Sequence, residues 1–315
     1  MEKLKILVDT HTDLDGIMSG LLIEYILGND FDVEVRHVNY KGFNNINDNV
    51  NDDFDNYDYI FITDISVDED KAELIESRWK DKVILLDHHG TAEWLNKYSW
   101  ADVIVEKEGV LQCGATLVYD FLKEDPRFKE YYDKIKKPQI LHDYVYLTRE
   151  YDTWEWKKNG TKDARRLNIL FGIDRKKRFI ENTMNKFKSG FFKLFTPDEN
   201  LVVKEEERQI FMYCLQNKQR YMEATIDGLK LKVVFCENHI NDIADAILEE
   251  YPDDTDIAVV INMNGRNVSF RTSRTDINVG EIVERFDGGG HPKAGGFKFT
   301  EEFMTNFISK LFWFR

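Results

Sequence analysis

Residues 4–16 read LKILVDTHTDLDG, a short apolar run that passes directly into histidine and aspartate residues. Leu4–Val8 has the pattern of a buried β-strand, and His11, Asp13 and Asp15 follow it at alternate positions. Because alternate residues of an extended segment point the same way, these three side chains can face one cavity. A carboxylate or imidazole just past the carboxyl end of a parallel strand lies where α/β sheets build ligand sites.

Two later apolar runs end in the same kinds of residue. Tyr59–Ile62 is followed by Thr63 and Asp64, and Lys82–Leu86 is followed by DHHG at residues 87–90. These strand ends can converge at one edge of a parallel sheet. Two metal ions about 3.5–4 Å apart need a bridging carboxylate, and Asp64 is the candidate because it ends the neighbouring strand. The segments therefore predict a two-metal phosphoryl-transfer site, whose mixed imidazole and carboxylate ligands favour Mn²⁺ over Mg²⁺.

Strand-like and helix-like segments alternate over about the first 125 residues, which is typical of βαβ units. This alternation predicts an α/β fold with a doubly wound, mostly parallel sheet and helices on both faces. The further elements predicted here are helices at Ile17–Leu27, Glu69–Arg78 and Ala115–Leu122 and strands at Asp32–Val38 and Ala101–Val105.

The second half of the chain predicts a helical region and then a smaller α/β domain. Thr196, Pro197 and Glu199 form a capping-box helix start, and that helix connects the two domains. We expect a catalytic domain at residues 1–195, the connecting helix at 196–223 and the second domain at 224–315. Its predicted elements are Leu229–Phe235, Ile240–Glu250, Ile257–Met263, Asn267–Thr272, Val279–Phe286, Phe297–Phe299 and Glu301–Phe312.

Composition narrows the class of protein further. The 315 residues carry a formal net charge of −15, which disfavours binding of long duplex nucleic acid and favours a small anionic substrate. No run approaches the roughly 18 apolar residues of a membrane span, and we expect no membrane partner. The start of the chain lacks a signal-peptide pattern, and the three cysteines lack metal-binding spacing, so we expect a cytoplasmic protein.

The ordered motifs of the first domain resemble those of the DHH phosphoesterase superfamily. They are His-x-Asp-x-Asp-Gly at residues 11–16, an isolated Asp64, Asp-His-His-Gly at residues 87–90, and Tyr-Asp at residues 151–152. That superfamily includes RecJ exonucleases, nanoRNases, cyclic-dinucleotide phosphodiesterases and family II pyrophosphatases. The compact first motif is similar to one branch of it and weakens the analogy with the pyrophosphatases.

The resemblance implies a pair of Mn²⁺ ions, with Mg²⁺ or Co²⁺ as alternatives, and a role for each motif residue. His89 would contact the substrate or assist proton transfer, and Asp87 would orient a histidine. His142-Asp143 competes with Asp152 for the place of the last ligand. The implied ligands are His11, Asp13 and Asp64 for one ion and Asp15, Asp64, His88 and Asp152 for the other.

A glycine-rich segment, DGGGHPKAGGF at residues 287–297, predicts a phosphate-binding site in the second domain. Consecutive glycines such as Gly289 and Gly290 let backbone N–H groups approach an anion, and His291 adds a donor. Arg271, at the end of a strand, could clamp a phosphate oxygen. The segment resembles the DHHA1 domain, in which Gly-Gly-Gly-His and a nearby arginine bind the terminal nucleotide or phosphate. Asp287 departs from that pattern, since the family often has another glycine there.

Together these features predict a hydrolase that cuts short oligoribonucleotides such as pApA to mononucleotides with a metal-activated water. The alternatives are a cyclic mono- or dinucleotide phosphodiesterase, a pAp phosphatase, a non-catalytic nucleotide-binding module and a RecJ-like DNA exonuclease. The chain offers no room for the extra domain of the last class, and a homodimer is compatible with the sequence.

Two further segments keep two interpretations each. The basic stretch Arg175–Lys188 steers a phosphate backbone or forms a solvated helix face. Trp154 and Trp156 stack on a nucleobase or belong to the core.

Overall fold

The computed structural model describes residues 3–44, 54–190 and 193–312, in two compact units at Met1–Val203 and Lys204–Arg315. The division falls within α9, the helix Pro197–Asn217. Among the described residues, no helix has the length and apolar content that crossing a membrane requires. The two units are described in turn.

The first unit contains a five-stranded parallel sheet in the order β2-β1-β3-β4-β5, as the alternating pattern predicted. Thr10, the last residue of β1, lies opposite His37 on β2 and Thr63 on β3. The strands therefore end level with one another, and the residues that follow them gather at one edge. The strands are β1 Lys5–Thr10, β2 Asp32–His37, β3 Tyr59–Thr63, β4 Val83–Asp87 and β5 Ala101–Val103.

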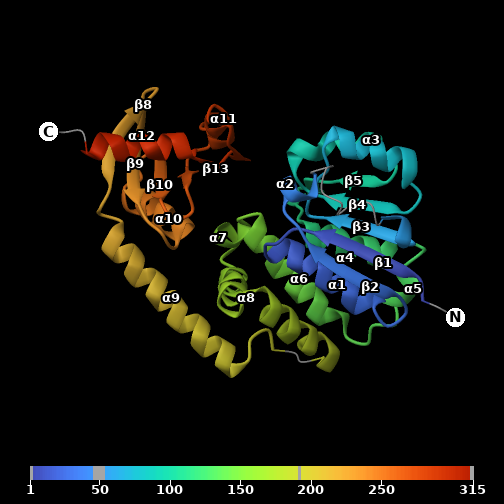
Figure 1. The fold of residues 1–315 in the computed structure, drawn as a ribbon. Helices are drawn as coiled ribbons and strands as arrows, with labels where there is room; N and C mark the ends of the chain where they lie inside the picture. The colour runs from blue at the N-terminus through green and yellow to red at the C-terminus, as the bar shows by residue number, and fades with distance from the viewer. Residues whose placement is uncertain (1–2, 45–53, 191–192, 313–315) are drawn as a thin grey trace. The chain divides into compact units, whose positions relative to one another are not determined.

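Helices cover both faces of this sheet, so its central strands are apolar on both sides. Figure 1 shows α3 (Glu69–Arg78) on one face and α1 (Leu14–Leu27) and α4 (Gly114–Glu124) on the other. The core beneath α3 includes Leu7, Ile60, Ile62, Ile75, Trp79 and Leu85. The connecting elements are α2 Tyr40–Phe43, η2 Phe54–Asn56, η3 Gly90–Lys97, β6 Glu106–Lys107, β7 Val110–Leu111 and α5 Lys129–Tyr132.

A helical layer follows, made of α6 (Pro138–Asp152), the short α7 (Glu155–Asn159) and α8 (Lys162–Ser189). Arg175, with φ 56° and ψ 163°, interrupts α8, and the basic stretch predicted there forms its second half. The capping box at the start of α9 is confirmed: the Thr196 N–H donates to Glu199 Oε2 at 2.7 Å, and the Glu199 N–H donates to Thr196 Oγ1 at 3.2 Å.

The second unit is a six-stranded mixed sheet in the order β12-β13-β11-β10-β9-β8. Only the β9–β10 pair is parallel among the pairs of this sheet that the described residues form. Its core includes Leu231, Val259, Phe270, Val279, Val283 and Phe299. The elements are β8 Met222–Ile226, β9 Leu229–Phe235, α10 Ile240–Glu250, β10 Ile257–Asn262, β11 Asn267–Arg271, α11 Val279–Glu284, β12 Gly289–His291, β13 Ala294–Lys298 and α12 Glu301–Phe312.

Two strands of this unit differ from the sequence prediction. β8 was not expected because every one of its residues is exposed, which removes the alternating pattern that marks a half-buried strand. The glycine run was expected as an anion-binding nest, but Gly289–His291 forms the edge strand β12 and pairs with β13. A Cβ at Gly290 would lie 2.3 Å from the Ala294 carbonyl oxygen, so the glycine permits this close pairing. The role of Gly289, Gly290 and His291 in substrate binding stays a prediction.

A buried ion pair fastens α9 to the first unit and carries a testable prediction. Lys186 Nζ donates to Glu199 Oε2 at 2.7 Å, to the Leu194 carbonyl at 3.0 Å and to the Tyr144 hydroxyl at 3.2 Å. The Lys186 and Glu199 side chains are 8% and 12% exposed. Lys186→Met leaves the Glu199 charge buried, and we expect it to lower the free energy of unfolding by about 3 kcal/mol.

The double variant Lys186→Met/Glu199→Gln removes both charges and keeps the cap, so it should recover most of that loss. Urea unfolding followed by tryptophan fluorescence measures both, because five of the six tryptophans lie in the first unit. A double variant as unstable as Lys186→Met would contradict this interpretation.

Candidate metal centre

The turn between β1 and α1 presents the first three polar side chains. Asp13 is the N-cap of α1, and its Oδ1 accepts from the Gly16 N–H at 3.1 Å. His11 Nδ1 lies 2.9 Å from Asp13 Oδ2. A Cβ at Gly16 would lie 2.4 Å from the His11 carbonyl oxygen, so this tight turn requires glycine. Asp15, in the first turn of α1, is 2% exposed.

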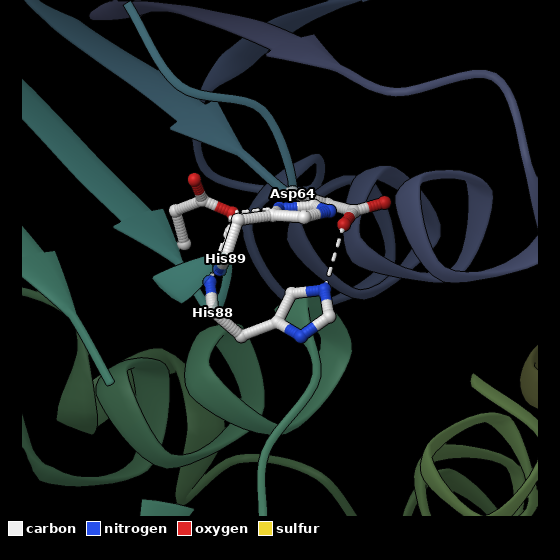
Figure 2. Close-up of side chains that lie close together, drawn as sticks. Asp64, His88 and His89 are labelled. Atoms are coloured by element: carbon white, nitrogen blue, oxygen red, sulfur yellow. Dashed lines mark hydrogen bonds and ion pairs between the residues drawn. The ribbon is translucent and has the colours of Figure 1, made fainter. Parts of the chain in front are cut away.

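Asp64 follows β3 and occupies the centre of the cluster. Its backbone is left-handed, with φ 54°, a conformation that non-glycine residues rarely adopt. The residue is 3% exposed, and its Oδ2 has no hydrogen-bond partner among the described residues. Asp64 Oδ1 lies 3.2 Å from His88 Nε2 (Figure 2), and Oδ2 lies 3.9 Å from His11 Nδ1.

His88 links this carboxylate to two others. Its Nε2 lies 3.8 Å from Asp15 Oδ2 and 3.6 Å from Asp152 Oδ2. Asp152 is the last residue of α6, so the helical layer contributes one residue to a site otherwise built from strand ends.

The structure thus brings together all six residues predicted to bind metal. In three sets, ligand atoms lie within 4.8 Å of one another. The first two sets match the division between two ions that the motifs implied, with Asp64 also 3.2 Å from the second set. The sets are His11, Asp13 and Asp64; Asp15, His88 and Asp152; and Asp64, Asp87, His88 and His89.

Asp87 holds the histidine pair in place. It is fully buried, and its Oδ1 lies 2.7 Å from His89 Nδ1, the second contact drawn in Figure 2. The same oxygen accepts from the His88 N–H at 2.8 Å. Asp87 therefore orients His89 through the ring and His88 through the backbone.

The electrostatics of the cluster fit divalent cations. Burial, and then the charges of Asp15 and Asp13, raise the pKa values of Asp64 and Asp152 well above their usual range. Burial lowers the pKa of His88 and so favours the neutral imidazole that binds metals. Crowded carboxylates of this kind need positive charge to ionise together. The partnerless Asp64 oxygen and the mixed oxygen and nitrogen donors provide places for it.

The start of α4 contributes contacts that the sequence alone did not identify. Asp15 Oδ2 accepts from the Gly114 N–H at 2.5 Å, and Oδ1 accepts from the Ala115 N–H at 2.8 Å. A helix N-terminus is a natural partner for a carboxylate. A Cβ at Gly114 would lie 2.6 Å from Asp64 Cβ, so only glycine fits between these aspartates. The available signal was a glycine at the first position of a helix, after Cys113.

Several candidate residues lie elsewhere. The competing pair His142 and Asp143 is on α6 with side chains 59% and 52% exposed, and neither belongs to the three sets. Arg271 is on β11 of the second unit, where its Nη2 donates to Asn241 Oδ1 at 2.6 Å. The side chain of His291 lies outside the described part of the structure.

Comparison with known proteins gives the family of this chain. Residues 5–148 match the N-terminal domain of the DHH family, and residues 230–312 match the DHHA1 domain. The chain is 30% identical over 312 residues to oligoribonuclease NrnB of Bacillus subtilis (strain 168), with 96% of this chain and 75% of that protein covered. The chain belongs to the DHH family. It is a phosphoesterase, a hydrolase that acts on phosphate ester bonds.

Solved structures of this family share the fold. The exonuclease RecJ bound to manganese has a TM-score of 0.57 at 14% identity, with 97% of this chain and 88% of that chain covered. The pGpG-specific phosphodiesterase PggH from Vibrio cholerae has a TM-score of 0.52 at 15% identity, with 98% and 97% covered. RecJ has been solved with Mn²⁺ and with Mg²⁺, so divalent metals bind within this family.

Gly114 gives the first prediction for this site. Gly114→Ala places a methyl group against Asp64 and displaces Asp15, so Mn²⁺ affinity measured by isothermal titration calorimetry should fall about 10- to 100-fold. Gly172→Ala is the control, because a Cβ there meets nothing within 4 Å. Wild-type affinity in Gly114→Ala would mean that this contact does not position the ligands.

His89 gives the second. Burial lowers its pKa, but the hydrogen bond and charge of Asp87 outweigh burial and raise the pKa to about 9. In metal-free Asp87→Asn protein only the lowering effect is left, so the pKa of His89 should fall to 6.5 or below. NMR titration of the histidine ring protons measures both forms. A pKa unchanged by the substitution would exclude Asp87 as the controlling partner.

Proposed function

We propose that this protein is a Mn²⁺-dependent phosphodiesterase that hydrolyses short oligoribonucleotides, such as pApA, to mononucleotides. One observation carries the proposal: six potential metal ligands gather around the buried Asp64 in a chain related over nearly its whole length to an oligoribonuclease. The net charge of −15 disfavours long polyanions, which agrees with a short substrate.

The proposed ligands divide as the three-membered sets do. His11 and Asp13 would hold one ion, Asp15, His88 and Asp152 the other, and Asp64 both. Such ions, when bound, supply Lewis acidity that lowers the pKa of water and offsets charge on a phosphoryl group.

The chain's own groups would manage the substrate and its protons. His89, kept protonated near neutral pH by Asp87, would donate a hydrogen bond to a phosphoryl oxygen and a proton toward the leaving oxygen. Asp87 cannot swing away, because its Oδ1 also accepts from the His88 backbone. Together they would align the reacting phosphate with the attacking water.

The second unit would hold the far end of the substrate. This part of the proposal rests on the DHHA1 match over residues 230–312, which contains Arg271 and the strand Gly289–His291. The guanidinium would clamp a phosphate oxygen, and outward-facing amides of an edge strand would add donors. We place the enzyme in the cytoplasm, where its three buried cysteines stay reduced.

A substrate panel in Mn²⁺ tests the proposal. We expect pApA to be converted to AMP, with little action on c-di-AMP, pAp, pyrophosphate or long single-stranded DNA. Asp64→Ala and His88→Ala should each lower kcat/KM at least about a thousandfold, since metal activation contributes several kcal/mol. His142→Ala, an exposed histidine of the same unit, should leave it unchanged.

Intact pApA would overturn the substrate assignment. Full turnover in both Asp64→Ala and His88→Ala would overturn the site.

A further inference from the structure

The corner between α6 and α7 carries three aromatic rings in series. The Tyr151 and Trp154 rings stack with centroids 6.2 Å apart at 29°, and the Trp154 and Trp156 rings follow at 6.5 Å and 36°. Trp154 has a left-handed backbone, with φ 60°. A bulky residue rarely adopts this conformation, and it persists where the surrounding structure enforces it.

These rings do not belong to the buried core. No residue of α7 is buried, and Trp154 and Trp156 are both partly exposed. By contrast, Trp79 and Trp100 pack beneath the sheet at 4% exposure each. The core interpretation of Trp154 and Trp156 is therefore wrong, and the rings form a partly exposed surface.

A buried carboxylate holds this surface rigid. Glu150 is fully buried, and its oxygens accept from Asn159 Nδ2 at 3.0 and 3.1 Å and from Thr161 Oγ1 at 2.9 Å. These bonds tie the end of α6 to the far end of α7, and Arg149 also pairs with Glu150. The rings are thus preorganised, which reduces the entropy lost when a ligand stacks on them.

The rings begin beside the metal centre. Asp152 stands between Tyr151 and Trp154 in the chain, and its Oδ2 lies 3.6 Å from His88 Nε2. Two residues of chain span at most about 7 Å, so the Trp154 backbone is within that distance of a proposed ligand. Lys157 Nζ lies 5.4 Å from the Trp154 centroid and 5.6 Å from the Trp156 centroid. It adds positive charge to this surface of an acidic protein.

We propose that Tyr151, Trp154 and Trp156 form a nucleobase-stacking subsite for the nucleotide whose phosphate is held at the metal centre, with Lys157 near that nucleotide's phosphate. The inference rests on the proposed function for its substrate class. Every nucleobase has a π-face, so such a subsite accepts all bases and distinguishes nucleotides from phosphate compounds without a base.

Calorimetric titration of the full-length, Mn²⁺-loaded protein with AMP and with ribose 5-phosphate tests the subsite without catalysis. Wild type should bind AMP about 10- to 100-fold more tightly than ribose 5-phosphate. Trp154→Leu should abolish the difference, and Trp154→Phe, which keeps a ring, should retain most of it. Thermal melting confirms that each variant is folded.

Trp94→Leu is the matched control. Trp94 is also partly exposed beside a tyrosine, Tyr98 at 6.5 Å, and a lysine, Lys97 at 5.0 Å, but it packs against the sheet core. It should leave the preference for AMP unchanged.

Equal affinities for AMP and ribose 5-phosphate in wild type, including no detectable binding of either, overturn the subsite. So does an undiminished preference for AMP in folded Trp154→Leu. If AMP binds through Trp154 but pApA is not hydrolysed, the proposed function fails and the subsite stands. If pApA is hydrolysed while Trp154→Leu retains the preference for AMP, only the subsite fails.

Discussion

The metal centre depends on one carboxylate that the protein cannot easily keep charged by itself. Asp64 is buried, lies among other acidic groups, and has an oxygen without a hydrogen-bond partner among the described residues. Its left-handed backbone adds strain, which proteins keep where surrounding structure and function require it. A cation removes the repulsion and provides the missing partner, so ion binding and the stability of this strand end are coupled.

The parallel sheet explains how residues far apart in sequence reach Asp64. Strands β1, β3 and β4 end level with one another, and each is followed at once by its polar side chains. Close packing then limits what can stand around them. Gly16 and Gly114 leave no space for a side chain, and the amides at the start of α4 hold Asp15. The helical layer completes the arrangement with Asp152, beside the rigid aromatic corner.

Local patterns predicted most of this structure, and long-range contacts account for what they missed. The bounds of α3, β9, α10 and α12 agree with the sequence prediction because periodicity and caps are local properties. The strand-end ligands were recognisable for the same reason. The contact of Gly114 with Asp15 joins residues about a hundred positions apart, and no local pattern records it. β12 escaped prediction because glycines carry no side-chain alternation, and its pairing depends on close backbone approach.

The most direct test of the metal centre is anomalous diffraction from a crystal of this protein soaked in Mn²⁺. The account predicts two anomalous peaks about 3.5–4 Å apart, with the Asp64 carboxylate between them. One peak should contact His11 and Asp13, and the other Asp15, His88 and Asp152. Absence of paired peaks at these side chains, or peaks bound only elsewhere on the chain, would contradict it.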